Sequence, residues 1–265
     1  MSKILKVDTV DSDEKFKDFF YNRLKSPLAI IGLAIVVFTI IVAIFPQVLT
    51  PLTLEQATGI YPGSWDPPSA THPLGQSRFG RDVLALLAYG VSTLIIVCIL
   101  PSLIGIVIGI LFVYIFKVHR WVKGLVVRFI IALLIIPSVL VLLIFLSILG
   151  SNVSVIMGII AMFMILGVTF LISKGNYSLN LTVMKLISYF PLLMIFNILL
   201  FEVRGFFGFS DPLIVQLGNN ISDARSYLYI APFASLWPSL AIFAVVGGFL
   251  ILHFGLKEPI PIISR

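Results

Sequence analysis

The sequence predicts an all-α membrane protein with about six transmembrane helices and both termini in the cytoplasm. Of its 265 residues, 59% are apolar and only 11% are charged, whereas a soluble domain has about 25% charged residues. Long uncharged stretches recur along the chain, and Lys and Arg are unevenly distributed between the segments that connect them. A soluble protein needs more polar side chains than this to cover its surface, so lipid is the solvent that suits this composition.

The uncharged stretches locate the spans, because a helix needs about 20 residues to cross a hydrocarbon core of about 30 Å. The stretch 129–173 is too long for one helix, and Gly150-Ser151-Asn152 supplies turn chemistry at its middle. Within 83–116, residues 83–90 are expected along the outer surface, and Pro101 is expected inside the span, where it removes one backbone hydrogen bond. The expected spans are 27–45, 91–116, 125–149, 153–173, 187–203 and 232–254.

The basic residues predict the orientation of these spans. With the N-terminus inside the cell, fourteen of the 18 Lys and Arg residues lie in cytoplasmic segments, as the positive-inside rule requires. Those left outside are Arg78, Arg81, Arg204 and Arg225. This asymmetry accounts for the net charge of +6 without any nucleic acid partner, and it predicts a multi-pass protein of the cell membrane surrounded by lipid.

Two regions follow from this arrangement. Residues 1–26 are expected to form a cytoplasmic segment, with Phe16, Phe19, Phe20 and Leu24 on one face of an amphipathic helix at the membrane surface. Residues 27–265 form the transmembrane domain. Its connecting parts are an outer loop over 46–82, a cytoplasmic loop over 174–186 and an outer segment over 204–231.

The sequence contains no recognisable catalytic, cofactor-binding or metal-binding pattern. It has no phosphate-binding G-x-x-x-x-G-K-[ST] and no hydrolase or zinc-protease motif. His72, His119 and His253 lie in different membrane compartments or at opposite ends of spans, and the single cysteine, Cys98, is expected to be a small buried hydrophobe. We therefore expect a chain that is not itself an enzyme.

The expected spans also lack ionisable residues at mid-membrane, where ion-coupled transporters keep them. Glu202 and Arg204 lie towards the end of a span. They are expected to pair with each other or with a partner subunit, because an unpaired charge at membrane depth is costly. Energy for any transport would have to come from a partner.

The outer loop carries the most specific pattern. Pro67, Pro68 and Pro73 fix φ, while Gly75 and Gly80 permit tight turns. Such a loop is either a rigid platform at the outer mouth or a packed cap without ligand contact. Asp82 suits a helix N-terminus. The motif residues are Trp65, Pro67, Pro68, His72, Pro73, Leu74, Gly75, Gly80, Arg81 and Asp82.

This pattern, W-x-P-P-S-x-x-H-P-L-G-x-x-x-x-G-R-D-V-L, resembles the C-type permease subunits of the dipeptide, oligopeptide and nickel ABC importer family. Weaker similarities occur in 25–32, 135–137, 149–150, 202–212 and 255–258. The resemblance implies a type I importer permease fold and a translocation path shared with a second, B-type permease. It also implies two cytoplasmic ATPases that use ATP and Mg, and an external binding protein that delivers peptides or similar small solutes.

The sequence departs from that family in the loop that would dock into an ATPase. Residues 173–185 have no acidic residue and no alanine pair, and they leave room for one or two helical turns at about 1.5 Å per residue. Candidates for partner contact are Lys174, Gly175, Asn176 and Lys185, and Pro137 is a candidate kink or gate. The alternative function is a permease-derived structural or regulatory subunit with weak or no ATPase coupling. An independent channel or secondary transporter is a third, less favoured, reading.

Overall fold

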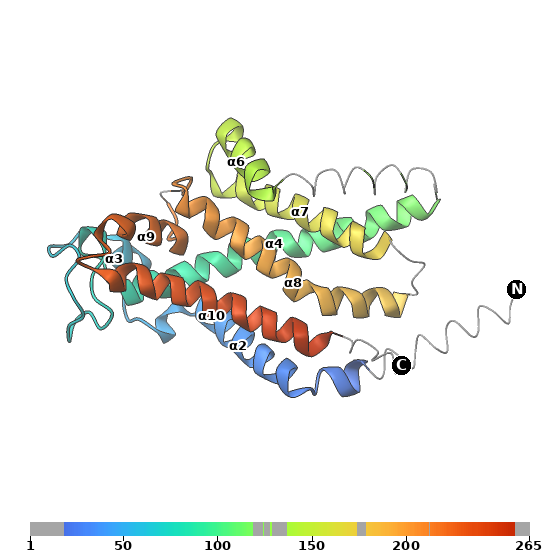
Figure 1. The fold of residues 1–265 in the computed structure, drawn as a ribbon, viewed down its shortest axis with the longest axis horizontal. Coiled ribbons are helices and arrows are strands. Elements are labelled where there is room, and N and C mark those ends of the chain that lie inside the picture. The colour runs from blue at the N-terminus through green and yellow to red at the C-terminus, as the bar shows by residue number, and fades with distance from the viewer. Residues whose placement is uncertain are drawn as a thin grey trace, which may run out of the picture.

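Long α-helices run side by side along one axis of the molecule, and short helices and loops gather at one end (Figure 1). The computed structural model describes residues 19–118, 124, 128, 137–173, 179–211 and 213–257. We name the end that carries α3 and α9 the loop end, and the opposite end, where Phe19 and Lys257 lie, the terminal end. No strand occurs in this described part of the chain, in agreement with an all-α fold.

The first and last long helices pack against each other along their length. Helix α2 spans Pro27–Ile44, with Pro27 in its first turn and the Ser26 hydroxyl accepting the Ala29 N–H at 3.1 Å. Helix α10 spans Pro232–Leu256 and also begins at a proline. The Ser26 hydroxyl donates to the Gly255 carbonyl at 3.1 Å, so the start of α2 is fixed to the end of α10. A short helical turn, η1 (Phe19–Arg23), precedes α2.

Helix α4 is a single helix of 36 residues, Val83–Val118. At about 1.5 Å per residue it is about 54 Å long, which exceeds the roughly 30 Å of a hydrocarbon core. Pro101 lies inside it, as predicted. The Ser102 hydroxyl donates to the Cys98 carbonyl at 2.6 Å beside this proline. Helix α4 packs against α7 and α2.

The remaining long helices are α7 (Val153–Ser173) and α8 (Leu179–Phe206), with the shorter α6 (Ser138–Leu149) beside the start of α7. Helix α6 ends at Gly150, whose φ of 86° suits glycine. The small helices of the loop end are η2 (Pro46–Val48), α3 (Leu54–Thr58), η3 (Arg78–Gly80), α9 (Leu217–Ala224) and η4 (Arg225–Tyr227).

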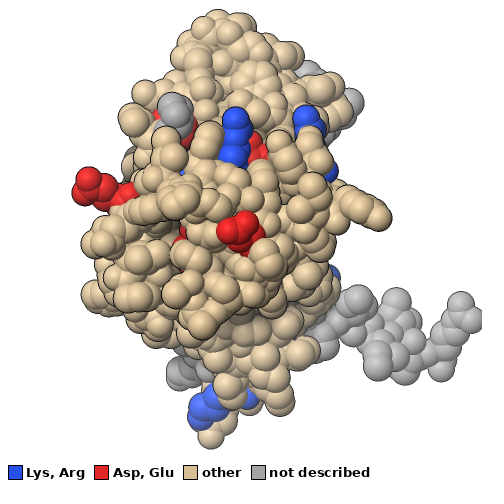
Figure 2. Space-filling view, turned by 90° about the vertical axis from the view of Figure 1, so that its left-hand side faces the viewer, with Lys and Arg blue, Asp and Glu red and all other residues tan. Residues whose placement is uncertain are grey.

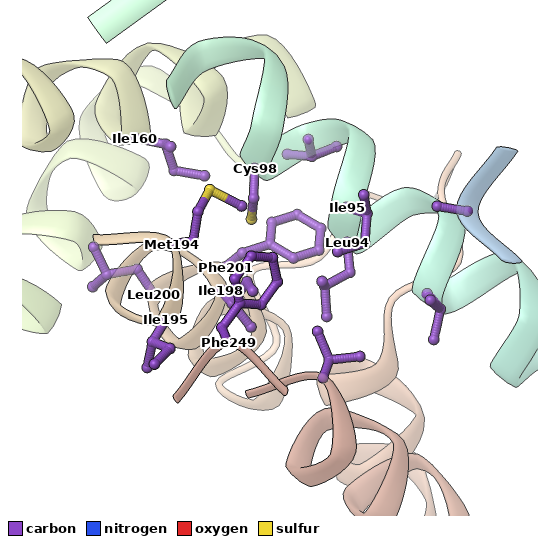
Figure 3. Close-up of a cluster of buried hydrophobic side chains, with 14 of the residues drawn as sticks. Leu94, Ile95, Cys98, Ile160, Met194, Ile195, Ile198, Leu200, Phe201 and Phe249 are labelled. Atoms are coloured by element: carbon purple, nitrogen blue, oxygen red, sulfur yellow. The ribbon is translucent and has the colours of Figure 1, made fainter. Parts of the chain in front are cut away.

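The core lies where α4, α7, α8 and α10 meet. Figure 3 shows Leu94 and Cys98 of α4 facing Met194 and Phe201 of α8, with Ile160 of α7 close by. These side chains are almost completely buried. Outside this core, α2, α4 and α10 expose many large apolar side chains. Five described helices are long and apolar enough to cross a membrane, namely α2, α4, α7, α8 and α10.

The structure corrects two of the expected boundaries. Residues 83–90 do not lie on the surface; they are the first turns of α4, and nearly all are buried. The reason is a local cover, because Ala57 and Val215 pack on Ala85 and Tyr89. Helix α8 begins at Leu179 instead of 187, so the expected loop over 174–186 is reduced to the connection 174–178 between two helices.

Within the expected span over 125–149, the described helix α6 begins only after Pro137. This residue is not helical and stands immediately before α6, which has 12 residues. Most positions between 119 and 136 lie outside the described residues. Five of the six expected spans therefore correspond to long helices, and the sixth is seen as α6 within the described part of the chain.

The close contact between α2 and α10 depends on glycine. A Cβ added at Gly255 would lie 2.2 Å from the Ala29 backbone nitrogen, whereas one added at Gly247 of the same helix meets nothing within 4 Å. We expect Gly255→Ala to lower stability by about 1–3 kcal/mol through overpacking. Gly247→Ala should leave stability unchanged or raise it by up to about 1 kcal/mol.

The stability of the two variants can be measured through Cys98, because this residue is buried and is the only cysteine. Its thiol reacts with a fluorogenic maleimide only when the protein unfolds, so fluorescence on heating in detergent gives the melting temperature. Equal melting temperatures for the two variants would contradict the packing described here.

Candidate functional site

The loop before α4 is held in one shape by backbone conformations with positive φ. Gly75 has a φ of 85°, and a Cβ there would lie 2.4 Å from the Phe233 ring. Gly80 has a φ of 69°, and a Cβ there would lie 2.4 Å from the Tyr61 carbonyl oxygen. Trp65 and Phe79 also have positive φ, which costs about 1–3 kcal/mol per residue and persists only where surrounding contacts enforce it.

Those contacts centre on Asp82. Its Oδ1 accepts the Ala85 N–H at 2.7 Å, so Asp82 caps the N-terminus of α4, as the sequence predicts. Its Oδ2 lies 2.9 Å from His72 Nδ1. Gln76 Nε2 lies 3.2 Å from His72 Nε2 and donates to the Gly80 carbonyl at 3.0 Å. A neutral His72 with its proton on Nδ1 satisfies both neighbours, so one carboxylate fixes both the helix and the loop.

Aromatic side chains join this loop to the segment before α10. The rings of Trp65 and Tyr227 stack with centroids 4.5 Å apart. Trp65 and Phe233 pack on Ala224 and Ala231. Because Phe233 belongs to α10, the loop, α9 and α10 form one connected cap at the loop end.

The other motif residues divide into two groups. Leu74 packs on the main core, and Arg81 Nε donates to the Gly59 carbonyl at 3.1 Å. Pro67, Pro68 and Pro73 are exposed. The structure therefore brings most of the motif together in the cap, while the prolines remain on its surface. Figure 2 shows this end, where charged side chains are few and scattered over an otherwise uncharged surface.

Glu202 and Arg204 are both buried at the loop end of α8. The Arg204 guanidinium donates to the Ser151 carbonyl at 3.1 Å and to Gln216 Oε1 at 2.9 Å, and it lies over the Phe201 ring. Glu202 accepts the Gly218 N–H, in the first turn of α9. Two residues apart on a helix do not face each other, and the structure records no ion pair between these two described side chains. Each instead binds a different part of the chain.

Glycines allow α8 and α9 to come this close. A Cβ added at Gly218 would lie 2.1 Å from the Glu202 carbonyl oxygen, and one at Gly205 would lie 2.5 Å from the Gln216 side chain. Gln216 Nε2 also donates to the Phe201 carbonyl. These contacts hold α9 against α8. One carboxylate oxygen of Glu202 and the Nε of Arg204 have no hydrogen-bond partner.

Sequence reasoning missed several polar residues that complete these contacts. Asp211 is buried and accepts the Val153 and Leu213 N–H groups, each at 3.0 Å, which fixes the start of α7. Deeper in the bundle, Asn197 of α8 donates to the Ser102 hydroxyl of α4 at 3.0 Å, and both residues are buried. Asn197 could have been found as the lone amide within an uncharged stretch.

A polar hollow of about 480 Å³ lies within the cap, between the loop before α4 and α9 with the segment that precedes it. Arg78 and Asp223 line it, with Arg78 Nη1 3.5 Å from Asp223 Oδ1, and Asp211 and Asn219 contribute further polar groups. The Asn220 amide nitrogen is buried there without a hydrogen-bond partner.

The candidates for partner contact are only partly described. Lys174, Gly175 and Asn176 lie outside the described residues. Lys185 lies in the first turns of α8 and is half-buried. Pro137 stands at the start of α6, and its role as a gate stays a prediction. Among the described residues, no group of three or more His, Cys, Asp or Glu side chains is arranged to hold a metal ion.

The Asp82 contacts predict how the loop responds to substitution. Asp82→Ala removes the α4 cap, worth about 1 kcal/mol, and releases His72. We expect trypsin to cleave after Arg78 and Arg81 about five times faster, because local opening becomes more frequent. Asp82→Asn keeps an acceptor for Ala85 and should have a smaller effect. Glu55→Ala, at an exposed residue of α3, is the control. If trypsin cleaves Asp82→Ala as slowly as this control, Asp82 does not hold the loop in place.

The buried arginine gives a second prediction. Lysine cannot reach Ser151 and Gln216 together, so Arg204→Lys should leave one buried acceptor unpaired, at a cost of about 1–3 kcal/mol. We expect faster amide hydrogen exchange in residues 213–224, measured by mass spectrometry in detergent. Arg225→Lys, at an exposed arginine of the same end, is the matched control. Unchanged exchange in Arg204→Lys would show that α9 does not depend on this contact.

Comparison with known proteins identifies the relatives of this chain. No family model matches it. It is 23% identical to the glutathione transport system permease protein GsiD of Pectobacterium atrosepticum, over 92% of this chain and 89% of that protein. It is 25% identical to the dipeptide transport system permease protein DppC of Alkalihalophilus pseudofirmus, over 92% and 88%. GsiD of Escherichia coli is 23% identical over 91% and 88%.

The similarity to these relatives extends over 91–92% of this chain. They confirm the predicted resemblance, the all-α membrane fold and the location in a membrane. The chain is thus similar, over most of its length, to permease proteins of glutathione and dipeptide transport systems.

Proposed function

We propose that this chain is a membrane-spanning permease subunit of an ATP-driven importer for peptides or similar small solutes, and that it forms the translocation path with a second permease. The observation that carries the proposal is similarity to peptide and glutathione permeases along nine-tenths of the chain. Five apolar helices and a capped loop end agree with such a role. The chain itself would be a transport component, not an enzyme.

The same comparison supports, in general terms, the partners that we propose. They are a second permease, two ATPases that would bind ATP and Mg, and an external binding protein. The residues of the long helices also indicate that energy for transport comes from a partner protein. In the described long helices, ionisable side chains occur only towards the ends, as with Lys185, Glu202, Arg204 and His253. The interior therefore offers no chain of charged groups for an ion-driven cycle.

The arrangement of α4 and α8 supports a mechanical role. Both helices run from the cap to the terminal end. They are joined near the middle of α4 by the Asn197–Ser102 hydrogen bond and by the core around Cys98. A movement imposed at one end would be carried by rigid helices to the other, as alternating access needs.

One observation favours a second candidate, a structural or regulatory subunit with weak ATPase coupling. The helices α7 and α8 are separated only by residues 174–178, whereas the related family places its ATPase-docking segment in this connection. In an asymmetric transporter the second permease would supply most of the drive, and this chain would couple weakly or through another surface, such as 117–124.

The experiment is purification of the tagged chain from its native membrane, followed by identification of bound proteins and reconstitution of the complex in liposomes. We expect a second permease and ATPases to co-purify, and ATP to drive uptake of radiolabelled dipeptide or glutathione. A stable complex without ATPase would support the structural subunit and overturn the permease proposal.

A pair of insertion variants distinguishes weak coupling of this chain to an ATPase from the absence of coupling. Inserting a docking segment of the family's length between residues 173 and 179 should raise ATP-driven uptake, while a Gly/Ser insertion of equal length should not. Equal uptake with both insertions would count against coupling through this connection.

A further inference from the structure

An apolar groove of about 320 Å³ lies towards the terminal end, between α2, α4, α8 and α10. Leu24 and Leu33, from α2 and the turn before it, Leu103 and Ile106 of α4, Phe190 of α8 and Leu252 of α10 are among its lining residues. Every residue that lines it has an apolar side chain. Water entering such a groove would find no hydrogen-bond partner on its walls, so the natural content is hydrocarbon.

The groove opens onto the surface that faces lipid. Leu33 is 45% exposed and Leu103 is 51% exposed, although both line the groove. Ile104, the next residue of α4, is 55% exposed and does not line it. The groove is therefore accessible from the bilayer, and its volume lies near the lower end of the 300–1,000 Å³ typical of ligand pockets.

Basic residues adjoin lining residues of the groove at its terminal end. Leu24 stands between Arg23 and Lys25, and the lining residue Leu256 is followed by Lys257. The Arg23 guanidinium reaches the Lys257 carbonyl at 3.5 Å, which brings these segments together, and Lys25 and Lys257 are exposed.

Acidic residues in the described part of the chain lie elsewhere. All of them belong to the loop end or to the helix ends that meet it: Glu55, Asp66, Asp82, Glu202, Asp211 and Asp223. The rim of the groove is thus positively charged without a described acidic neighbour, directly beside an apolar channel. That combination complements a lipid whose head is negative and whose tail is hydrocarbon.

We propose that this groove binds one acyl chain of an anionic phospholipid, with its phosphate at Arg23, Lys25 and Lys257. The acyl chain fills the space between α2 and α4, and the basic side chains at the rim select the anionic headgroup. Each basic side chain near the membrane surface contributes roughly a five-fold gain in affinity for anionic lipid. The site lies at the opposite end from the cap and does not depend on which solute is transported.

The test is native mass spectrometry of the full chain purified in detergent, titrated with phosphatidylglycerol or with phosphatidylcholine of the same acyl chains. We expect one phosphatidylglycerol to be retained in preference to phosphatidylcholine. The double variant Lys25→Gln, Lys257→Gln changes only exposed side chains. It should reduce that preference roughly thirty-fold while retaining weak binding of both lipids.

A second pair of variants tests the groove itself. Leu103→Trp fills it and should reduce retention of both lipids, whereas Ile104→Trp, on the adjacent outward-facing residue, should reduce neither. Equal retention of the two lipids by the unmodified chain, or loss in Ile104→Trp as large as in Leu103→Trp, would overturn the proposal. So would efficient cross-linking of Leu103→Cys to a second permease or to residues 1–18, since either would then occupy the groove.

Discussion

The structure depends on one constraint, that a backbone polar group in hydrocarbon must find its hydrogen-bond partner within the protein. Long uninterrupted helices meet this requirement, and at the loop end, where much of the described irregular backbone lies, the Asp82, Arg204 and Gln216 side chains supply partners. The same constraint explains how polar side chains enter the bundle. Asn197 and Ser102 are buried as a pair, and Ser102 in turn bonds to the Cys98 carbonyl next to Pro101.

The cap and the helices form one mechanical unit because a few side chains serve two purposes. Asp82 ends the loop and starts α4, so the loop cannot shift without disturbing the first turn of that helix. Glu202 and Arg204 attach α9 and the start of α7 to the end of α8. A partner acting on the cap would therefore act on α4 and α8 together, which is the property that a permease subunit with a distant energy source requires.

The spans could be predicted where residues with strong local preferences mark their ends. Pro27 and Pro232 begin α2 and α10, and the expected span 153–173 coincides with α7. Prediction failed where tertiary packing decides. Residues 83–90 look like a surface segment until Ala57, Val215 and Leu217 are seen to cover them. The pairing of Arg204 with Gln216 and of Glu202 with Gly218 depends on the return of α9 against α8, which no local pattern specifies.

The pairing of α2 with α10 has a consequence for biosynthesis. The two helices are separated by most of the chain, since the Ser26–Gly255 hydrogen bond joins residues 229 positions apart. During translation α2 enters the membrane before α10. Until α10 follows, Gly32 of α2 lacks its neighbour, the Leu252 backbone, which lies so close that a Cβ added at Gly32 would be 2.3 Å from the Leu252 nitrogen. Contacts of such high sequence separation form late. Ribosome stalling or premature termination shortly before α10 would thus leave an unclosed bundle exposed to membrane quality-control proteases.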